Sequence, residues 1–91
     1  MPTMFGYHDV TDTAHWLASP KREEVFGPMG ITNIRTFVNP RDRTKVGVMM
    51  DVPDVNLVLS AMASPPPEMI EAMKHDGVLP ETLVMLVEER P

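Results

Sequence analysis

The chain has 91 residues, enough for one small domain over residues 1–91 but not for two, and a formal net charge of −5. The acidic balance argues against nucleic acid as a partner, and no apolar run reaches the ~20 residues of a membrane-spanning helix, so we expect neither partner. There is no cysteine for a disulfide framework, and the first ten residues lack the features of a signal peptide, so we expect a cytoplasmic protein.

The first half of the chain predicts a strand, an interrupted helix and a second strand. Residues 4–10 mix apolar and polar side chains as a strand can, and Asp12 then provides an N-cap for a short helix. Ser19, followed by proline at the first helical position, interrupts this helix and begins another that should end at Gly27. Residues 31–39 alternate in character and predict the second strand, which a proline turn joins to the third.

The second half repeats this plan. Residues 45–52 carry apolar side chains at every second position and predict the clearest strand of the chain. Asp54 is the expected N-cap of one helix, Ser64 the expected N-cap of the next, and Gly77 the expected glycine at its C-terminal end. Residues 83–87 form a nearly continuous apolar run and predict the fourth strand.

This order predicts an α+β fold of the ferredoxin-like type, βαββαβ, in a single domain. The interrupted helices should lie on one face of a four-stranded antiparallel sheet. Right-handed crossovers place the first and third strands in the centre of that sheet.

The sheet face without helices is predicted to be apolar as well. Both faces of the strand over residues 83–87 carry apolar side chains, and Phe37 and Met49 add apolar surface. Such a face either awaits a ligand or packs on a second sheet, and large exposed apolar patches are uncommon in soluble monomers. We therefore expect a homodimer that buries sheet against sheet.

Two segments carry a resemblance to a known family, together with the element order and the length. Trp16 precedes Phe26-Gly27-Pro28-Met29-Gly30, and a predicted helix runs from Ser64-Pro65 to Met73-Lys74-His75. In these features the chain resembles the dimeric α+β barrel superfamily, which includes antibiotic-biosynthesis-type monooxygenases, haem-degrading enzymes and stress-responsive barrel proteins. The resemblance implies that two ferredoxin-like subunits join their sheets into a barrel, with a pocket between sheet and helices in each.

The resemblance does not extend to haem degradation. The haem-degrading members carry an asparagine, a tryptophan and a histidine near the pocket. His75 is similar in place to the helix histidine, but the first strand has His8 and no asparagine, and Trp16, the only tryptophan, lies on the first helix. These departures argue against a haem-degrading enzyme.

Histidine is the residue best suited to act as a base near pH 7. His8, in a predicted central strand, is the first candidate catalytic base, and His75, at a helix end, is the second, with helix capping as its structural alternative. His15 and Arg22 are expected on helix surfaces. The histidine spacing matches no zinc template and the five glycines form no phosphate-binding motif, so we expect no metal site and no cofactor.

Three functions agree with these patterns. The first is a homodimer that binds a small apolar or aromatic ligand between sheet and helices, in a pocket lined by Tyr7, Trp16, Phe26 and Phe37. The second is a cofactor-independent enzyme of the monooxygenase or isomerase kind, with His8 or His75 as its base. The third is a structural assembly module. The nine methionines suit an adaptable cavity or the gaps of a small core, and we favour the core.

Overall fold

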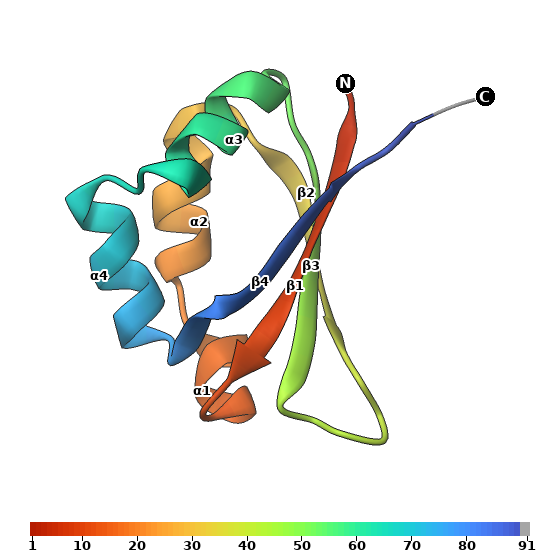
Figure 1. The fold of residues 1–91 in the computed structure, drawn as a ribbon, viewed down its shortest axis with the longest axis vertical. Coiled ribbons are helices and arrows are strands. Elements are labelled where there is room, and N and C mark those ends of the chain that lie inside the picture. The colour runs from red at the N-terminus through yellow and green to blue at the C-terminus, as the bar shows by residue number, and fades with distance from the viewer. Residues whose placement is uncertain (90–91) are drawn as a thin grey trace.

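A computed structural model describes residues 1–89 of the protein, in which four strands form one sheet and the helices lie on one side of it (Figure 1). The strands are β1 (Thr3–Val10), β2 (Thr32–Val38), β3 (Lys45–Asp51) and β4 (Val78–Val87). The helices are α1 (Thr13–Ala18), α2 (Lys21–Phe26), α3 (Val55–Ala63) and α4 (Pro67–His75), with a 3₁₀ turn, η1 (Gly27–Met29). None of these helices has both the length and the apolar character that crossing a membrane requires.

The sheet has the strand order β2-β3-β1-β4, and every neighbouring pair is antiparallel. This confirms the predicted α+β fold with βαββαβ order, and it places the first and third strands in the centre. The broken helices α1–α2 and α3–α4 form the two crossovers and pack on the same face.

Alternation along the strands separates two environments. In β1, Met4, His8 and Val10 are buried beneath the helices, whereas Phe5 and Tyr7 point to the other face. The most deeply buried side chains all lie on the helical side of the sheet: Met4, Trp16, Met50, Val52 and Val58. The core therefore lies between one face of the sheet and the helices.

Side-chain caps begin two of the four helices, α1 and α3. Asp12 accepts a hydrogen bond from the His15 N–H, and Asp54 accepts one from the Leu57 N–H, each at 3.1 Å, as their N-cap assignment predicted. The Ser19 hydroxyl accepts a hydrogen bond from the Lys21 N–H at 3.1 Å. Helix α2 begins one residue later than predicted, so its cap residue is Pro20, which makes no side-chain hydrogen bond, and the prediction of Ser19 as N-cap is wrong.

The predicted start of α4 is wrong. The helix begins at Pro67, and its cap residue, Pro66, makes no side-chain hydrogen bond. Ser64 instead closes α3, because its N–H donates to the Ser60 carbonyl at 3.0 Å. The proline run after Ser64 is extended at Pro66, which delays the next helix by two residues relative to the prediction.

Strand β4 is longer than the predicted residues 83–87, because it begins at Val78 and contains a bulge. Leu79 pairs with Asp9 and Val84 pairs with Tyr7, so the segment of β4 between these pairs is longer than the matching segment of β1. Pro80 lies in this bulge, where a residue without an N–H disrupts no ladder hydrogen bond. The Asp9 N–H donates to the Thr82 hydroxyl at 2.8 Å instead of to a strand carbonyl. The bulge therefore lies beside His8.

The connection from α4 to β4 depends on Gly77, which has a φ of +70°. A side chain at this position would also collide with the Thr11 hydroxyl. Glycine is the residue that adopts this backbone conformation without steric cost, so the predicted C-terminal glycine of α4 is confirmed.

The caps lead to a stability prediction. Asp54→Ala removes the acceptor of the Leu57 N–H and should lower the free energy of unfolding by about 1 kcal/mol. Urea denaturation followed by circular dichroism measures this change. Ser64→Ala is the matched control, and it should change the free energy by no more than about 0.5 kcal/mol, since its exposed hydroxyl caps no helix. Equal losses in the two variants would contradict the assignment of the caps.

Candidate functional site

A cavity of about 90 Å³ lies between the sheet and the helices. Trp16 of α1, Phe26 of α2 and His8 of β1 are among the residues that line it. Five methionines contribute to its wall: Met50, Met62, Met69, Met73 and Met85. Because thioether side chains adapt to irregular shapes, this wall suits a small apolar molecule.

Two residues expected in this pocket lie elsewhere. Tyr7 and Phe37 are each 43% exposed on the opposite face of the sheet. Tyr7 adjoins His8 in the strand, so alternation sends its side chain to the other face. Phe37 pairs with Gly47, which also belongs to that face. The predicted pocket therefore keeps Trp16 and Phe26 and loses Tyr7 and Phe37.

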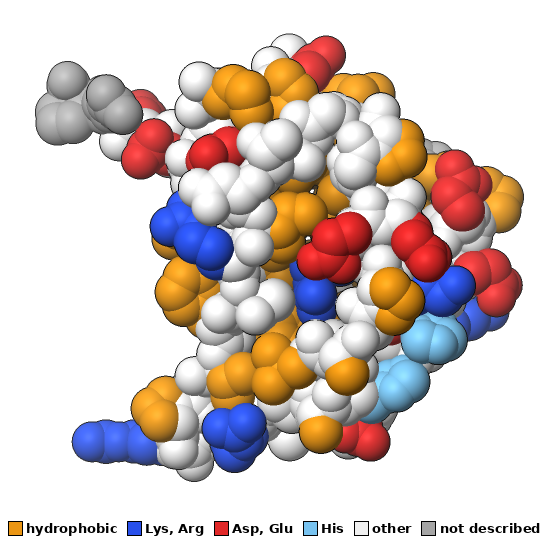
Figure 2. Space-filling view, turned by 180° about the vertical axis from the view of Figure 1, so that it is seen from behind, with side chains coloured by type: hydrophobic (Ala, Val, Ile, Leu, Met, Phe, Trp, Pro, Cys, Tyr) orange, Lys and Arg blue, Asp and Glu red, His pale blue; other side chains and the backbone are white. Residues whose placement is uncertain are grey.

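Four ionisable side chains interrupt the apolar wall: His8, Lys21, Arg22 and Asp76. Figure 2 shows basic and hydrophobic side chains together in the recess between the sheet and the helices, and acidic side chains over the helical side. Arg22 and Asp76 are almost completely buried. The cavity is thus apolar over most of its wall and charged over a small part of it.

Trp16 holds two of these side chains in place. Its own side chain is 2% exposed, and its ring meets the His8 ring edge-on with the centroids 5.7 Å apart. The Arg22 guanidinium lies over the same indole, 4.5 Å from the ring centroid, and its Nη2 donates to the Trp16 carbonyl at 3.0 Å. The indole therefore orients both the imidazole and the guanidinium at one end of the cavity.

The environment of His8 favours the neutral imidazole. Burial lowers the pKa of His8 below its ordinary value of 6.5, and the nearby positive charge of Arg22 lowers it further, against the raising effect of the hydrogen bond to the Asp9 carbonyl. Nδ1 donates to that carbonyl at 3.3 Å, so Nε2 is left with the lone pair. His8 is therefore equipped to accept a proton at Nε2.

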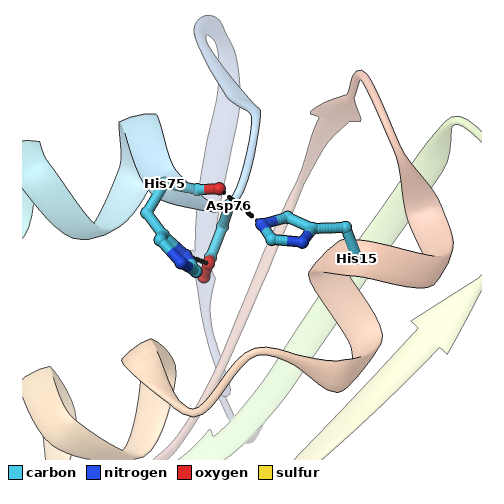
Figure 3. Close-up of side chains that lie close together, drawn as sticks. All are labelled: His15, His75 and Asp76. Carbon is cyan, nitrogen blue, oxygen red and sulfur yellow. Dashed lines mark hydrogen bonds and ion pairs between the residues drawn. The ribbon is translucent and has the colours of Figure 1, made fainter.

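His75, the second candidate base, does not line this cavity. Its Nδ1 donates to Asp76 Oδ1 at 2.8 Å, while Nε2 of His15 donates to the His75 carbonyl at 2.7 Å (Figure 3). His75 lies on an outer groove of about 730 Å³ along α2, α3 and α4. About half of the residues around that groove are exposed, and Met69 and Ala72 are the buried ones among them.

His15, His75 and Asp76 form a cluster that the sequence spacing did not predict. Their potential ligand atoms lie within 4.8 Å of one another. A tetrahedral zinc ion with bonds of about 2.1 Å holds its ligand atoms about 3.4 Å apart, so this arrangement would have to contract. Both imidazoles already form hydrogen bonds, and the bond from His15 to the His75 carbonyl connects α1 to the end of α4. We assign the cluster a structural role in joining the two helices.

The sheet face opposite the helices carries a second feature, which we call the outer patch: Phe5, Tyr7, Phe37, Met49, Val84 and Leu86. Phe5 contacts both other rings, with centroid distances of 6.3 Å to Tyr7 and 5.7 Å to Phe37. Its ring lies over Gly47, where an added Cβ would come within 2.5 Å of Phe5 Cζ. Leu86 is 51% exposed, so much of this apolar surface faces solvent in the single chain.

Arg22 and Asp76 are the site residues that sequence reasoning missed. Arg22 was expected on the surface of α2, yet its residue is only 8% exposed. The sequence offers one signal for the contact between Arg22 and Trp16, because Arg22 follows Trp16 by six residues across the helix break at Ser19-Pro20. That break turns α2 back toward α1 and brings the guanidinium over the indole.

Comparison with known proteins identifies the fold. No protein-family model matches the chain, and no curated protein matches its sequence. Among solved structures, an antibiotic biosynthesis monooxygenase superposes with a TM-score of 0.61 at 10% identity, over 100% of this chain and 99% of that one. A Deinococcus radiodurans protein assigned to the same monooxygenases superposes with a TM-score of 0.59 at 12% identity, over 100% of this chain and 93% of that one. The chain therefore has the ferredoxin-like α+β fold of these structures, and its predicted resemblance to them is confirmed at the level of the fold.

Proposed function

We propose that the protein is a homodimer whose subunits each bind a small apolar or aromatic molecule in the cavity between sheet and helices. The cavity wall carries the proposal, because Trp16, Phe26 and five methionines surround a space with few polar groups. The similar structures described as antibiotic biosynthesis monooxygenases support it, since they share this fold over the whole chain.

The outer patch supports the dimeric part of the proposal. It is a group of apolar side chains on the sheet face that no helix covers, beside the exposed Arg35, and Tyr7, Phe37 and Leu86 in it are more than two-fifths exposed. Soluble monomers rarely leave such a surface open, and a two-fold symmetric dimer buries the same patch of both subunits at once.

Adjacent residues of β4 test the dimer. Val84 belongs to the outer patch, whereas Met85 lines the cavity. Val84→Asp should convert the dimer to a folded 10.2 kDa monomer, because it places a charge in the sheet-to-sheet contact. Met85→Asp should unfold the chain, because it places a charge in the core. Sedimentation equilibrium and circular dichroism separate the two results, and a monomeric parent protein would refute the dimer.

Ligand binding is tested with small aromatic probes. Toluene or phenol at ten times its Kd should stabilise the protein by about 1.4 kcal/mol and raise Tm by about 5–10 °C in a thermal-shift measurement. Ala72→Leu should abolish the rise, because Ala72 lines the cavity and the larger side chain fills it.

Ala63→Leu is the control for this substitution. Ala63 is exposed at the end of α3 and does not line the cavity, so the variant should keep the full rise in Tm. A rise that survives in Ala72→Leu would place binding elsewhere. A parent protein that responds to no probe would favour a structural assembly module instead.

A second candidate function is a cofactor-independent enzyme that uses His8 as a base on a quinol-like substrate. The observation that favours it is the neutral imidazole in the cavity wall, with Nε2 free to accept a proton from a substrate hydroxyl. Oxygen uptake with a dihydroxynaphthalene probe tests it. His8→Gln should slow the uptake, and His75→Gln should leave it unchanged, because His75 lies outside the cavity.

The protonation of His8 is itself measurable. Its imidazole should titrate below pH 6.5 in a proton NMR titration of the folded protein. Between the pKa of His8 in the folded protein and 6.5, the unfolded chain binds more protons than the folded chain does. The contribution of neutral His8 to the free energy of unfolding is therefore complete above pH 6.5, and it is lost as the pH falls through this window. His8→Gln should therefore remove part of the acid-side slope of stability against pH. An unchanged slope would contradict the burial of His8.

A further inference from the structure

We propose that the ligand of the cavity is a small aromatic acid whose carboxylate binds the Arg22 guanidinium. This rests on the proposed ligand-binding function and adds the charge of the ligand to it. The cavity wall places a buried guanidinium beside an indole and a space whose wall is mostly apolar. A molecule with one ring and one carboxylate matches both parts of that wall.

The first argument is the pairing of Arg22. A guanidinium has five N–H groups, and the hydrogen bond to the Trp16 carbonyl uses one of them. No aspartate or glutamate among residues 1–89 forms an ion pair with it. Burial of a charged group without an ionic partner is costly, and a carboxylate is the anion whose two oxygens match the planar fork of arginine.

The second argument is the protonation state of the Arg22 guanidinium. Burial lowers the pKa of Arg22 from its ordinary value, and the charges of Glu23 and Asp76 oppose this without forming an ion pair with the guanidinium. The side chain remains a cation because arginine is not deprotonated in proteins. A bound carboxylate would replace the lost hydration of this cation.

The other charges around the cavity allow this assignment. Asp76 is the acidic side chain in the wall, and its Oδ1 already accepts the hydrogen bond from His75 Nδ1 at 2.8 Å. Lys21 adds a second positive group to the wall, and its partner Glu24 lies 3.4 Å away on the exposed side of α2. His8 is neutral near pH 7, so Arg22 and Lys21 are the cations of the wall.

The size of the cavity limits the apolar part of the ligand. An engineered cavity of about 150 Å³ in another protein holds benzene, and this cavity, at about 90 Å³, is smaller. One ring therefore fits only if the methionine side chains move slightly, as their flexible thioethers permit.

The test compares a carboxylate with its neutral amide. Benzoate and benzamide have the same ring and nearly the same shape, and isothermal titration calorimetry measures the Kd of each. The parent protein should bind benzoate about tenfold more tightly than benzamide. Arg22→Gln should bring the two constants to about the same value, because the charged partner is gone.

Two further variants complete the design. Arg41→Gln removes an exposed arginine of the β2–β3 turn and should keep the tenfold preference. Arg22→Lys keeps the charge but loses the planar fork, so its preference for benzoate over benzamide should be reduced. If Arg22→Gln does not fold, Arg22→Lys tests whether Arg22 binds the carboxylate. Circular dichroism checks the fold of each variant.

The outcomes separate the two proposals. Equal binding of benzoate and benzamide to the parent protein would overturn the assignment of an acid and leave the apolar ligand site intact. A preference that persists in folded Arg22→Gln and Arg22→Lys would also overturn it. Failure of every aromatic probe, charged or neutral, would overturn the ligand-binding function itself.

Discussion

Both crossovers of this fold pack on the same face of the sheet, so every strand must satisfy two different environments with alternate residues. In β1 the helical side receives Met4, His8 and Val10, and the other side receives Phe5 and Tyr7. The core, the cavity and the outer patch all follow from this single arrangement. Successive side chains of a strand point to opposite faces, so alternate residues face the cavity and the residues between them face the outer patch.

Within the cavity the indole of Trp16 controls how charge is distributed. It is buried, and it contacts both the imidazole of His8 and the guanidinium of Arg22. Two cations at the same end of a small apolar space would repel each other, and the low dielectric would strengthen that repulsion. The arginine keeps its charge, whereas the histidine is held in the neutral form mainly by burial, and the charge of Arg22 adds to this effect by lowering its pKa further. One end of the cavity combines a fixed cation with a neutral base.

Local patterns predicted the fold well because its main signals are local. The alternation over residues 45–52 and the caps Asp12 and Asp54 act within a few residues, and the structure has the elements they indicate. The site was harder to predict, because burial of Arg22 depends on contacts with Trp16 across a helix break. The placement of Tyr7 was wrong because alternation puts it on the opposite face of the strand from His8. The placement of Phe37 was wrong because a sequence alone does not say which face of a strand the helices cover.

The bulge in β4 has a consequence for changes in chain length. Leu79 and Val84 are five positions apart, an odd number, yet they pair with Asp9 and Tyr7, which share one face of β1. The bulge therefore changes which alternate residues of β4 face inward, so that Val78 before it and Met85 after it both line the cavity. Substitutions within the bulge leave this arrangement unchanged. A one-residue insertion or deletion there would reverse it, exchanging the inward and outward sides of the last strand, so the number of residues in this short segment is constrained more tightly than their identity.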